Sequence, residues 1–325
     1  MMTLKNGSVL LILFVSFSFL FIGCGEEGGE GLVSGTITAP DGETPVAGAT
    51  VTITDEGGQL GVVLLERSTQ SQSDGTYSFS DIPDGEYTVM ADKGHFHGEI
   101  TIEVTNGNVQ GDTDVEVDID PTKVAVVPGT FDDIGAILTD MGIGFTTIYD
   151  SDLVDWDIVN SFYVIFLNCG SDTSYAENED VQENLRNFVK GGGSIYASDW
   201  EYLYIEYTWP DAIDFYGNDL SDPYIGSEQH VDADILDSEL SDYMGKSVVE
   251  IYYNLGSWIV IDAVGEGTTT HIQGDIETDE GPMEDKPLLV SFADEDGSVV
   301  YTTFHNETQL TEDAENILKY FVFEL

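Results

Sequence analysis

Basic side chains are scarce in this sequence. Its 325 residues include 9 Lys and Arg against 62 Asp and Glu, which gives a formal net charge of −53 at pH 7. Such a surface repels nucleic-acid phosphates, so we exclude DNA and RNA as partners. Two interpretations of the acidity stay open. It is either a solvated surface suited to a salty medium, or a set of cation sites, calcium above all, because carboxylate oxygens are the ligands of that ion.

Apolar runs long enough to cross a bilayer are also lacking. The uncharged stretch from Val9 to Ile22 is shorter than the ~20 residues that a membrane helix needs. Lys5 precedes this stretch and the small residue Gly23 follows it, which is typical of a targeting segment. Residues 1–23 are therefore predicted to be a signal peptide.

The end of this segment, LFIGC at residues 20–24, resembles the lipobox of bacterial lipoproteins, although Phe21 stands where that family more often has Leu. The resemblance implies that Cys24 is acylated and becomes the amino terminus. It also implies a membrane partner, and the outer membrane of the cell envelope as location, because Gly25 and not Asp follows the cysteine. An ordinary secretory signal is the alternative. Residues 24–31, rich in Gly and Glu, are predicted to be a flexible acidic linker.

Cysteine is nearly absent. Only Cys169 would remain in the body of the mature chain beside the anchoring Cys24. An internal disulfide is therefore excluded, although the envelope would permit one. Stability must come from the packed cores.

Residues 32–120 show alternating apolar and polar positions between turn residues, which predicts a seven-stranded β-sandwich. Asp-Gly pairs such as Asp41-Gly42 and Asp74-Gly75 supply turn residues that tolerate positive φ. The predicted strands are Val33–Thr38, Ala49–Thr54, Val62–Gln70, Thr76–Asp81, Glu86–Asp92, Glu99–Val104 and Thr113–Ile119.

The strings GTITAPDGETPVAGATVTIT and SDGTYSFSDIPDGEYTVMA in this region resemble the carboxypeptidase regulatory-like domain, a prealbumin-type sandwich. That resemblance implies the fold and no activity. Members of the family act mainly as spacers, stabilisers or modules that contact carbohydrate and protein.

From residue 122 to residue 325 the pattern changes to strands alternating with helices. Buried strands are predicted at Lys123–Pro128, Phe145–Tyr149, Tyr163–Leu167 and Ser194–Ser198, with helices at Phe131–Met141 and from Val181 to Val189. This alternation predicts a doubly wound, mostly parallel, flavodoxin-like sheet. An insertion at about 202–285 is expected to hold strands Val248–Tyr253 and Trp258–Val264. The strands Pro287–Phe292 and Ser298–Phe304 and the helix Glu312–Phe323 would close the domain.

The motifs VIFLNCGS, FVKGGGSIYASDW and GSVVYTTFHNE resemble the class I glutamine amidotransferase-like fold, in particular its trehalose-utilisation branch. In catalytic members a Cys occupies the sharp turn that Asp199 occupies here. The resemblance implies that Gly170 matches a backbone oxyanion donor, and that His305 and Glu307 match the family's His-x-Glu pair. The thiol of the triad would then be missing.

This difference decides the expected chemistry. A carboxylate is a far poorer acyl nucleophile than a thiolate, so glutamine hydrolysis is not expected. Cys169 could substitute if His305 lay beside it and lowered its pKa. The alternative is that Cys169 is a small buried residue at a strand end, and that His305 is simply hydrogen-bonded to a carboxylate.

Two metal interpretations stay open. Asp199, Glu201, His305 and Glu307 would suit a divalent cation if their side chains converge. His95 and His97 could form a metal pair, but no third ligand is spaced to complete a site, so we expect exposed loop or strand residues.

Aromatic residues after the turn alternate in a partly strand-like way and could form a platform for sugars, or else the core of the insertion. The candidate ligand-binding residues are Trp200, Tyr202, Tyr204 and Trp209.

Three functions follow. The favoured hypothesis is a non-catalytic envelope lipoprotein that binds a glycan or an envelope protein. The second is an envelope hydrolase acting on a glycan or amide, in which His305 and Glu307 work with Asp199 or Cys169. The third is calcium-assisted carbohydrate binding; no other cofactor is expected.

Overall fold

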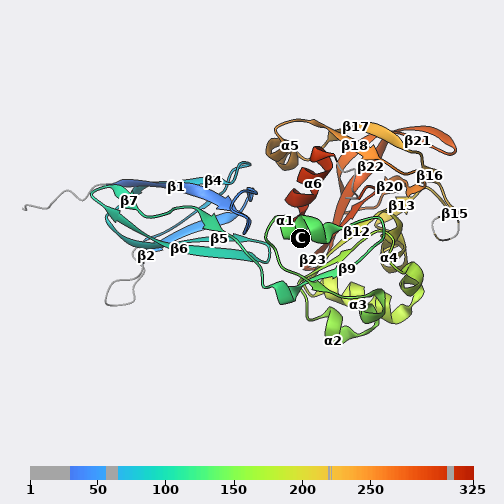
Figure 1. Ribbon diagram of the computed structural model, residues 1–325, viewed down its shortest axis with the longest axis horizontal. Helices are drawn as coiled ribbons and strands as arrows, with labels where there is room; N and C mark the ends of the chain where they lie inside the picture. The colour runs from blue at the N-terminus through green and yellow to red at the C-terminus, as the bar shows by residue number, and fades with distance from the viewer. Residues whose placement is uncertain (1–29, 56–64, 219, 221, 306–310) are drawn as a thin grey trace, which may run out of the picture.

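The computed structural model describes residues 30–55, 65–218, 220, 222–305 and 311–325. It contains a β-sandwich followed by a larger α/β domain, and the two lie end to end along the long axis of the molecule (Figure 1). The predicted fold class, a sandwich followed by a doubly wound, largely parallel sheet, is confirmed. Residues 1–23, Cys24 and Glu307, on which several predictions depend, lie outside the described residues.

The sandwich has two sheets, with strand orders β4-β1-β8 and β3-β2-β5-β6-β7. Their pairs are antiparallel except β1 with β8, which is parallel. The seven predicted strands all have counterparts, and a short eighth, β7, follows β6. The part of the predicted third strand before residue 65 is outside the described residues. The strands are β1 Gly31–Thr38, β2 Thr50–Asp55, β3 Glu66–Gln70, β4 Thr76–Ile82, β5 Gly85–Lys93, β6 Phe96–Thr105, β7 Asn108–Gln110 and β8 Val115–Glu116.

Five parallel strands form the centre of the α/β sheet, in the order β10-β9-β11-β12-β23. In chain order this is 2-1-3-4-5, the flavodoxin-like arrangement that the sequence predicts. Strands β9, β11 and β12 are buried along their whole length because helices cover both faces of the sheet. The strands are β9 Val124–Val127, β10 Thr146–Thr147, β11 Val164–Leu167, β12 Ser194–Ser198 and β23 Gly297–Thr302.

Helix α6 contacts both α1 and α5 on one side of the sheet, and α2, α3 and α4 lie together on the other (Figure 1). Helix α3 starts where the Asn178 side chain accepts a hydrogen bond from the Asp180 N–H, and it stops at three glycines. Gly193 has to be glycine, because a Cβ there would lie 2.4 Å from the Phe188 ring. The helices are α1 Ile134–Asp140, α2 Trp156–Val159, α3 Glu179–Lys190, α4 Tyr202–Thr208, α5 Ser238–Met244 and α6 Glu312–Val322.

The predicted insertion supplies α4, α5 and antiparallel strands, several of which continue the same sheet, whereas β13 with β20 and β14 with β15 form two separate two-stranded sheets. Strand β22 forms the predicted hairpin with β23, and β21 pairs along β22. Strand β18 has the predicted bounds and pairs with β17. The strand-like alternation expected after Trp200 is wrong, because these residues form helix α4. The added strands are β13 Ile213–Phe215, β14 Gly217–Asn218, β15 Asp222–Pro223, β16 Ile225–Gly226, β17 Gln229–Ile235, β18 Val248–Tyr253, β19 Trp258–Ile259, β20 Ile261–Val264, β21 Thr268–Thr278 and β22 Gly281–Asp294.

The two domains share one hydrophobic core. A single cluster of buried side chains runs from the sandwich through the face of the sheet covered by α1 and α6. At the junction the rings of Phe96 and Phe323 pack edge to face, with centroids 4.8 Å apart. The Lys93 Nζ lies 2.7 Å from Glu324 Oε1. The two domains therefore pack against each other as one body.

Among the described helices, none combines the length and the apolar character that crossing a membrane requires.

Candidate functional site

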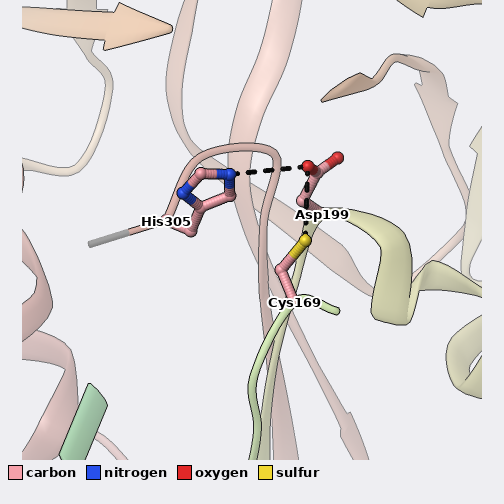
Figure 2. A group of neighbouring side chains, drawn as sticks. All are labelled: Cys169, Asp199 and His305. Atoms are coloured by element: carbon pink, nitrogen blue, oxygen red, sulfur yellow. Dashed lines mark hydrogen bonds and ion pairs between the residues drawn. The ribbon is translucent and has the colours of Figure 1, made fainter. Parts of the chain in front are cut away.

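Three side chains meet at the carboxyl edge of the parallel strands. Cys169 follows β11, Asp199 follows β12 and His305 follows β23, and their donor atoms all lie within 4.8 Å of one another. The Asp199 Oδ2 is 3.6 Å from Cys169 Sγ and 3.7 Å from His305 Nε2 (Figure 2). The carboxylate thus lies between the thiol and the imidazole. Among the residues that the structure describes, this is the one group of three or more potential metal ligands.

Asp199 occupies a strained turn between β12 and the short 3-10 helix η4, Asp199–Glu201. Its φ is 46°, in the left-handed region that costs a residue other than glycine about 1–2 kcal/mol. Hydrogen bonds hold the residue there. The Tyr301 hydroxyl donates to the Asp199 carbonyl at 2.7 Å, and the Ile259 N–H donates to Oδ1 at 2.7 Å. The turn has the geometry of a nucleophile elbow, with a carboxylate in place of a nucleophilic thiol or hydroxyl.

Burial controls the protonation of this group. Asp199 is 3 % exposed, and its removal from water raises the pKa of its carboxyl. The hydrogen bond from Ile259 lowers this pKa but is the smaller effect, so the pKa is about 8. The pKa of the Cys169 thiol is raised too, by burial first and then by the negative charge of Asp199. A reactive cysteine needs the opposite environment. Cys169 therefore matches the interpretation as a buried residue at a strand end.

Gly170, the predicted oxyanion donor, lies beside the buried carboxyl of Glu201. That carboxyl accepts a hydrogen bond from the neighbouring Ser171 N–H at 3.1 Å. Glu201 is wholly buried. It therefore points toward the Gly170 turn and away from Asp199, so the predicted metal set of Asp199, Glu201, His305 and Glu307 does not form as such.

A buried polar network supports this turn. The Ser171 Oγ lies 2.9 Å from Glu201 Oε2 and 2.7 Å from Asp150 Oδ1, and the Tyr204 hydroxyl donates to Asp150 at 2.8 Å. Burial raises the pKa of Glu201 to about 8. The Ser171 hydroxyl has one proton, so it can donate to either Glu201 or Asp150 and links the two carboxyls.

Two residues of the site were missed from the sequence. The Ser198 Oγ donates to the buried Asp132 carboxylate and accepts from the Cys169 N–H at 3.0 Å, so it ties β9 and β11 to β12. Asp132 follows the predicted strand Lys123–Pro128 by a few residues. Its place beyond a carboxyl strand end was the signal that could have revealed it.

A cavity of about 260 Å³ opens above the three side chains. Cys169, Asp199 and His305 lie at one side, and aromatic rings line much of the rest. The Trp200 side chain, 37 % exposed, is fixed by a 2.7 Å hydrogen bond from its Nε1 to the Ser257 carbonyl. Tyr252 and Trp258, which the sequence analysis missed, also line the cavity; their signal was the aromatic strand-turn-strand segment from residue 248 to residue 264.

A larger hollow of about 690 Å³ lies beyond Phe131, beside α1. It contains neither Cys169 nor His305 among its lining residues. We place the candidate site in the smaller cavity, because the carboxyl of Asp199, its strained turn and the imidazole of His305 all lie there.

The remaining aromatic candidates lie elsewhere. Tyr202 and Tyr204 are 2 % and 1 % exposed and belong to the core, so their rings offer no face to a ligand. Trp209 packs on Phe292 and donates to Asp294 beside a different hollow. Of the four predicted platform residues, Trp200 alone lines the candidate cavity.

His95 and His97 have separate partners. His97 is exposed and lies 2.7 Å from Asp92, whereas the His95 ring stacks on Tyr163 of the second domain with centroids 4.6 Å apart. His95 is thus a domain-junction residue, and the two rings do not form a metal pair.

Comparison with known proteins identifies the first domain. Residues 32–120 match the model of the carboxypeptidase regulatory-like domain, as the sequence predicts. No curated protein matches the chain.

Among solved structures, the chain is similar to a protein assigned as a GMP synthase subunit from Thermoplasma acidophilum, with 11% identity and a TM-score of 0.44 over 63% of this chain and 94% of the other. A ThuA-like protein from Bacteroides uniformis gives 8% identity and a TM-score of 0.44 over 62% and 91%. The major pilin subunit of Bacillus cereus gives 19% identity and a TM-score of 0.22. That match covers 27% of this chain and only 30% of the pilin.

Proposed function

We propose that this chain is a cell-envelope lipoprotein, anchored in the outer membrane through Cys24, whose second domain is a non-catalytic binding module on an amidotransferase-like scaffold. One observation carries the proposal: the residue at the strained turn after β12 is the buried carboxylate of Asp199. A turn of this shape presents a nucleophile in enzymes that use it, and here the group presented is a poor acyl nucleophile.

The surroundings of the turn support the same conclusion. The Cys169 thiol beside the turn does not replace the missing nucleophile, because burial and the neighbouring Asp199 raise its pKa, whereas a reactive cysteine needs a lowered one.

A glycan is the ligand that the cavity suits best. The partly exposed indole of Trp200 and the ring of Tyr252 supply apolar faces, on which the C–H faces of a sugar ring pack. Asp199 and His305 lie on the same cavity and can bond sugar hydroxyls. The volume of about 260 Å³ lies just below the ~300–1,000 Å³ of typical ligand pockets, so the cavity would hold one end of a longer saccharide and the remainder would lie outside.

Titration with a panel of neutral oligosaccharides, followed by calorimetry and tryptophan fluorescence, tests this proposal. We expect Trp200→Ala to weaken binding at least tenfold, which is about 1.4 kcal/mol. The matched control is Trp156→Ala, because Trp156 is also 37 % exposed but is at the start of α2. Equal affinities of the two variants, or no binding by any member of the panel, would contradict a glycan site.

The membrane anchor is tested separately by fractionation of cells that express the chain. We expect the protein in the membrane fraction, and Cys24→Ala in the soluble fraction. A wild-type chain that is recovered soluble would overturn the lipoprotein proposal without affecting the glycan proposal.

A second function, hydrolysis of a glycan or amide, is favoured by the convergence of His305, Asp199 and Cys169 on one cavity. It requires that His305→Ala abolish turnover while the far-UV circular dichroism stays unchanged. His271→Ala is the matched control, since the side chains of His305 and His271 are 11% and 12% exposed and each imidazole lies beside an Asp carboxylate. Wild-type protein that turns over neither amides nor glycans eliminates this function.

A further inference from the structure

In the cluster of Cys169, Asp199 and His305, the two separations measured from the Asp199 carboxylate are close to those of a tetrahedral metal site. In a zinc site with bond lengths of ~2.3 Å to sulfur and ~2.0 Å to oxygen and nitrogen, ligand atoms are separated by about 3.5 Å for S···O and about 3.3 Å for N···O. The observed separations from Asp199 Oδ2 are 3.6 Å to Sγ and 3.7 Å to Nε2. The three ligand atoms all lie within 4.8 Å of one another, and the thiol and the imidazole would have to come to about 3.5 Å of each other for one ion to bind all three.

We propose that Cys169 Sγ, Asp199 Oδ2 and His305 Nε2 bind one zinc ion or a similar transition-metal ion, with the fourth coordination position open to the 260 Å³ cavity. The donor set decides the class of metal. A thiolate and an imidazole favour zinc-like ions, whereas calcium and magnesium take oxygen ligands alone. The cluster thus differs from the calcium sites that the acidic composition suggests.

Neighbouring groups hold two of the ligands in place, as the outer shell of a metal site does. The Ile259 N–H binds Asp199 Oδ1 and leaves Oδ2 directed at the thiol and the imidazole. The Ser198 Oγ accepts from the Cys169 N–H and so fixes the backbone that carries the sulfur. Figure 2 shows the carboxylate of Asp199 in contact with both the imidazole of His305 and the sulfur of Cys169.

Three protein ligands and an open fourth position are the pattern of zinc sites that bind a water or ligand oxygen. All three ligands line the cavity assigned above to a glycan, so a sugar hydroxyl could complete the shell. This role toward the sugar rests on the proposed function. The metal site itself is independent of it, because metal binding is measured without saccharide.

Cobalt(II) is the probe, since it replaces zinc and its absorption reports the ligands. The full chain is purified as Cys24→Ala, so that Cys169 is its single thiol, and is stripped of metal with a chelator. Calcium is kept in excess to occupy surface carboxylates. We expect one equivalent of cobalt to produce a thiolate-to-metal charge-transfer band and intense visible bands of tetrahedral geometry, and zinc to abolish both.

Variants assign the ligands. Cys169→Ala should lose the charge-transfer band, and His305→Ala should weaken zinc binding at least about tenfold in competition with a chromophoric chelator. His271→Ala, which removes an imidazole of similar burial, should bind zinc as the parent does. If Cys169→Ala fails to fold, the zinc affinity of His305→Ala still tests the proposal. The proposal is overturned if the parent gives no charge-transfer band, if calcium displaces the cobalt, or if zinc affinity is unchanged in His305→Ala.

Oligosaccharide titrations of stripped and zinc-loaded protein separate the two proposals. Zinc binding without any glycan binding refutes the glycan proposal and leaves the metal site standing. Glycan binding by protein that takes up no zinc refutes the metal site and leaves the glycan proposal standing.

Discussion

Replacing Phe96 with alanine is expected to weaken the junction between the two domains. The Phe96 side chain starts β6 and is 2 % exposed, and its ring packs edge to face against Phe323, which follows α6. Truncation of a buried phenylalanine costs about 3–5 kcal/mol of unfolding free energy. Since a chain of this size loses about 2 °C of melting temperature per kcal/mol, Tm should fall by roughly 6–10 °C.

Part of that loss comes from packing inside the sandwich, so a double-mutant cycle isolates the part that crosses the junction. Phe96→Ala, Phe323→Ala and the double variant should show a coupling of about 0.5–1.5 kcal/mol, the value of an aromatic pair. Phe79→Ala is the control, because Phe79 contacts Tyr77 within the sandwich and should combine additively with Phe323→Ala.

Differential scanning calorimetry and urea unfolding measure both quantities. Because one core cluster spans the two domains, we expect a single unfolding transition for the wild-type chain. Two well-separated wild-type transitions, or additive effects of the two phenylalanine substitutions, would show that the junction does not couple the domains and would refute the reasoning.

Three further outcomes are expected. Ser171→Ala should lower the unfolding free energy by about 1–3 kcal/mol in urea titrations, because two buried carboxyls lose the hydroxyl between them; a change within about ±0.3 kcal/mol would contradict that network. Gly129→Ala should perturb the site, since its Cβ would lie 2.1 Å from the Cys169 carbonyl oxygen, and the cobalt spectrum should change. The pKa of Asp237 lies below its ordinary value because His271 hydrogen-bonds to it, so its contribution to stability is present above about pH 4 and is lost as the pH falls through the folded-state pKa. Urea midpoints at pH 7 and pH 3 should differ less in Asp237→Asn than in the parent, and an equal difference would contradict this assignment.

The central strands and helix α3 were predictable from sequence because local rules determine them. The run from Val164 to Leu167 is apolar on both faces, and the three glycines after Lys190 can only end a helix. Each signal lies within the segment that it describes.

Helix α4 was not predictable from its pattern. Tyr202 and Tyr204 alternate as in a strand, whereas Tyr202 and Ile205 have helical spacing, and both sets are buried. A short apolar segment satisfies either period, so its packing against α3 and the preceding turn decides.

The site was predictable in its parts and not in its geometry. The sequence indicates that Cys169, Asp199 and His305 follow parallel strands and therefore share an edge. It contains no signal that Asp199 turns toward the thiol while Glu201, two residues later, turns toward Ser171. Those directions depend on the backbone of η4 and on Ile259, which is far along the chain.

The turn at Asp199 also has a consequence for protein engineering. The bond from the Tyr301 hydroxyl reaches only the main chain of Asp199, whereas the bond from the Ile259 N–H reaches its carboxylate. Asp199→Cys would therefore introduce a sulfur at a bend that keeps the first bond and loses the second. Selection for a new covalent chemistry could start from this variant, which a change in one codon produces.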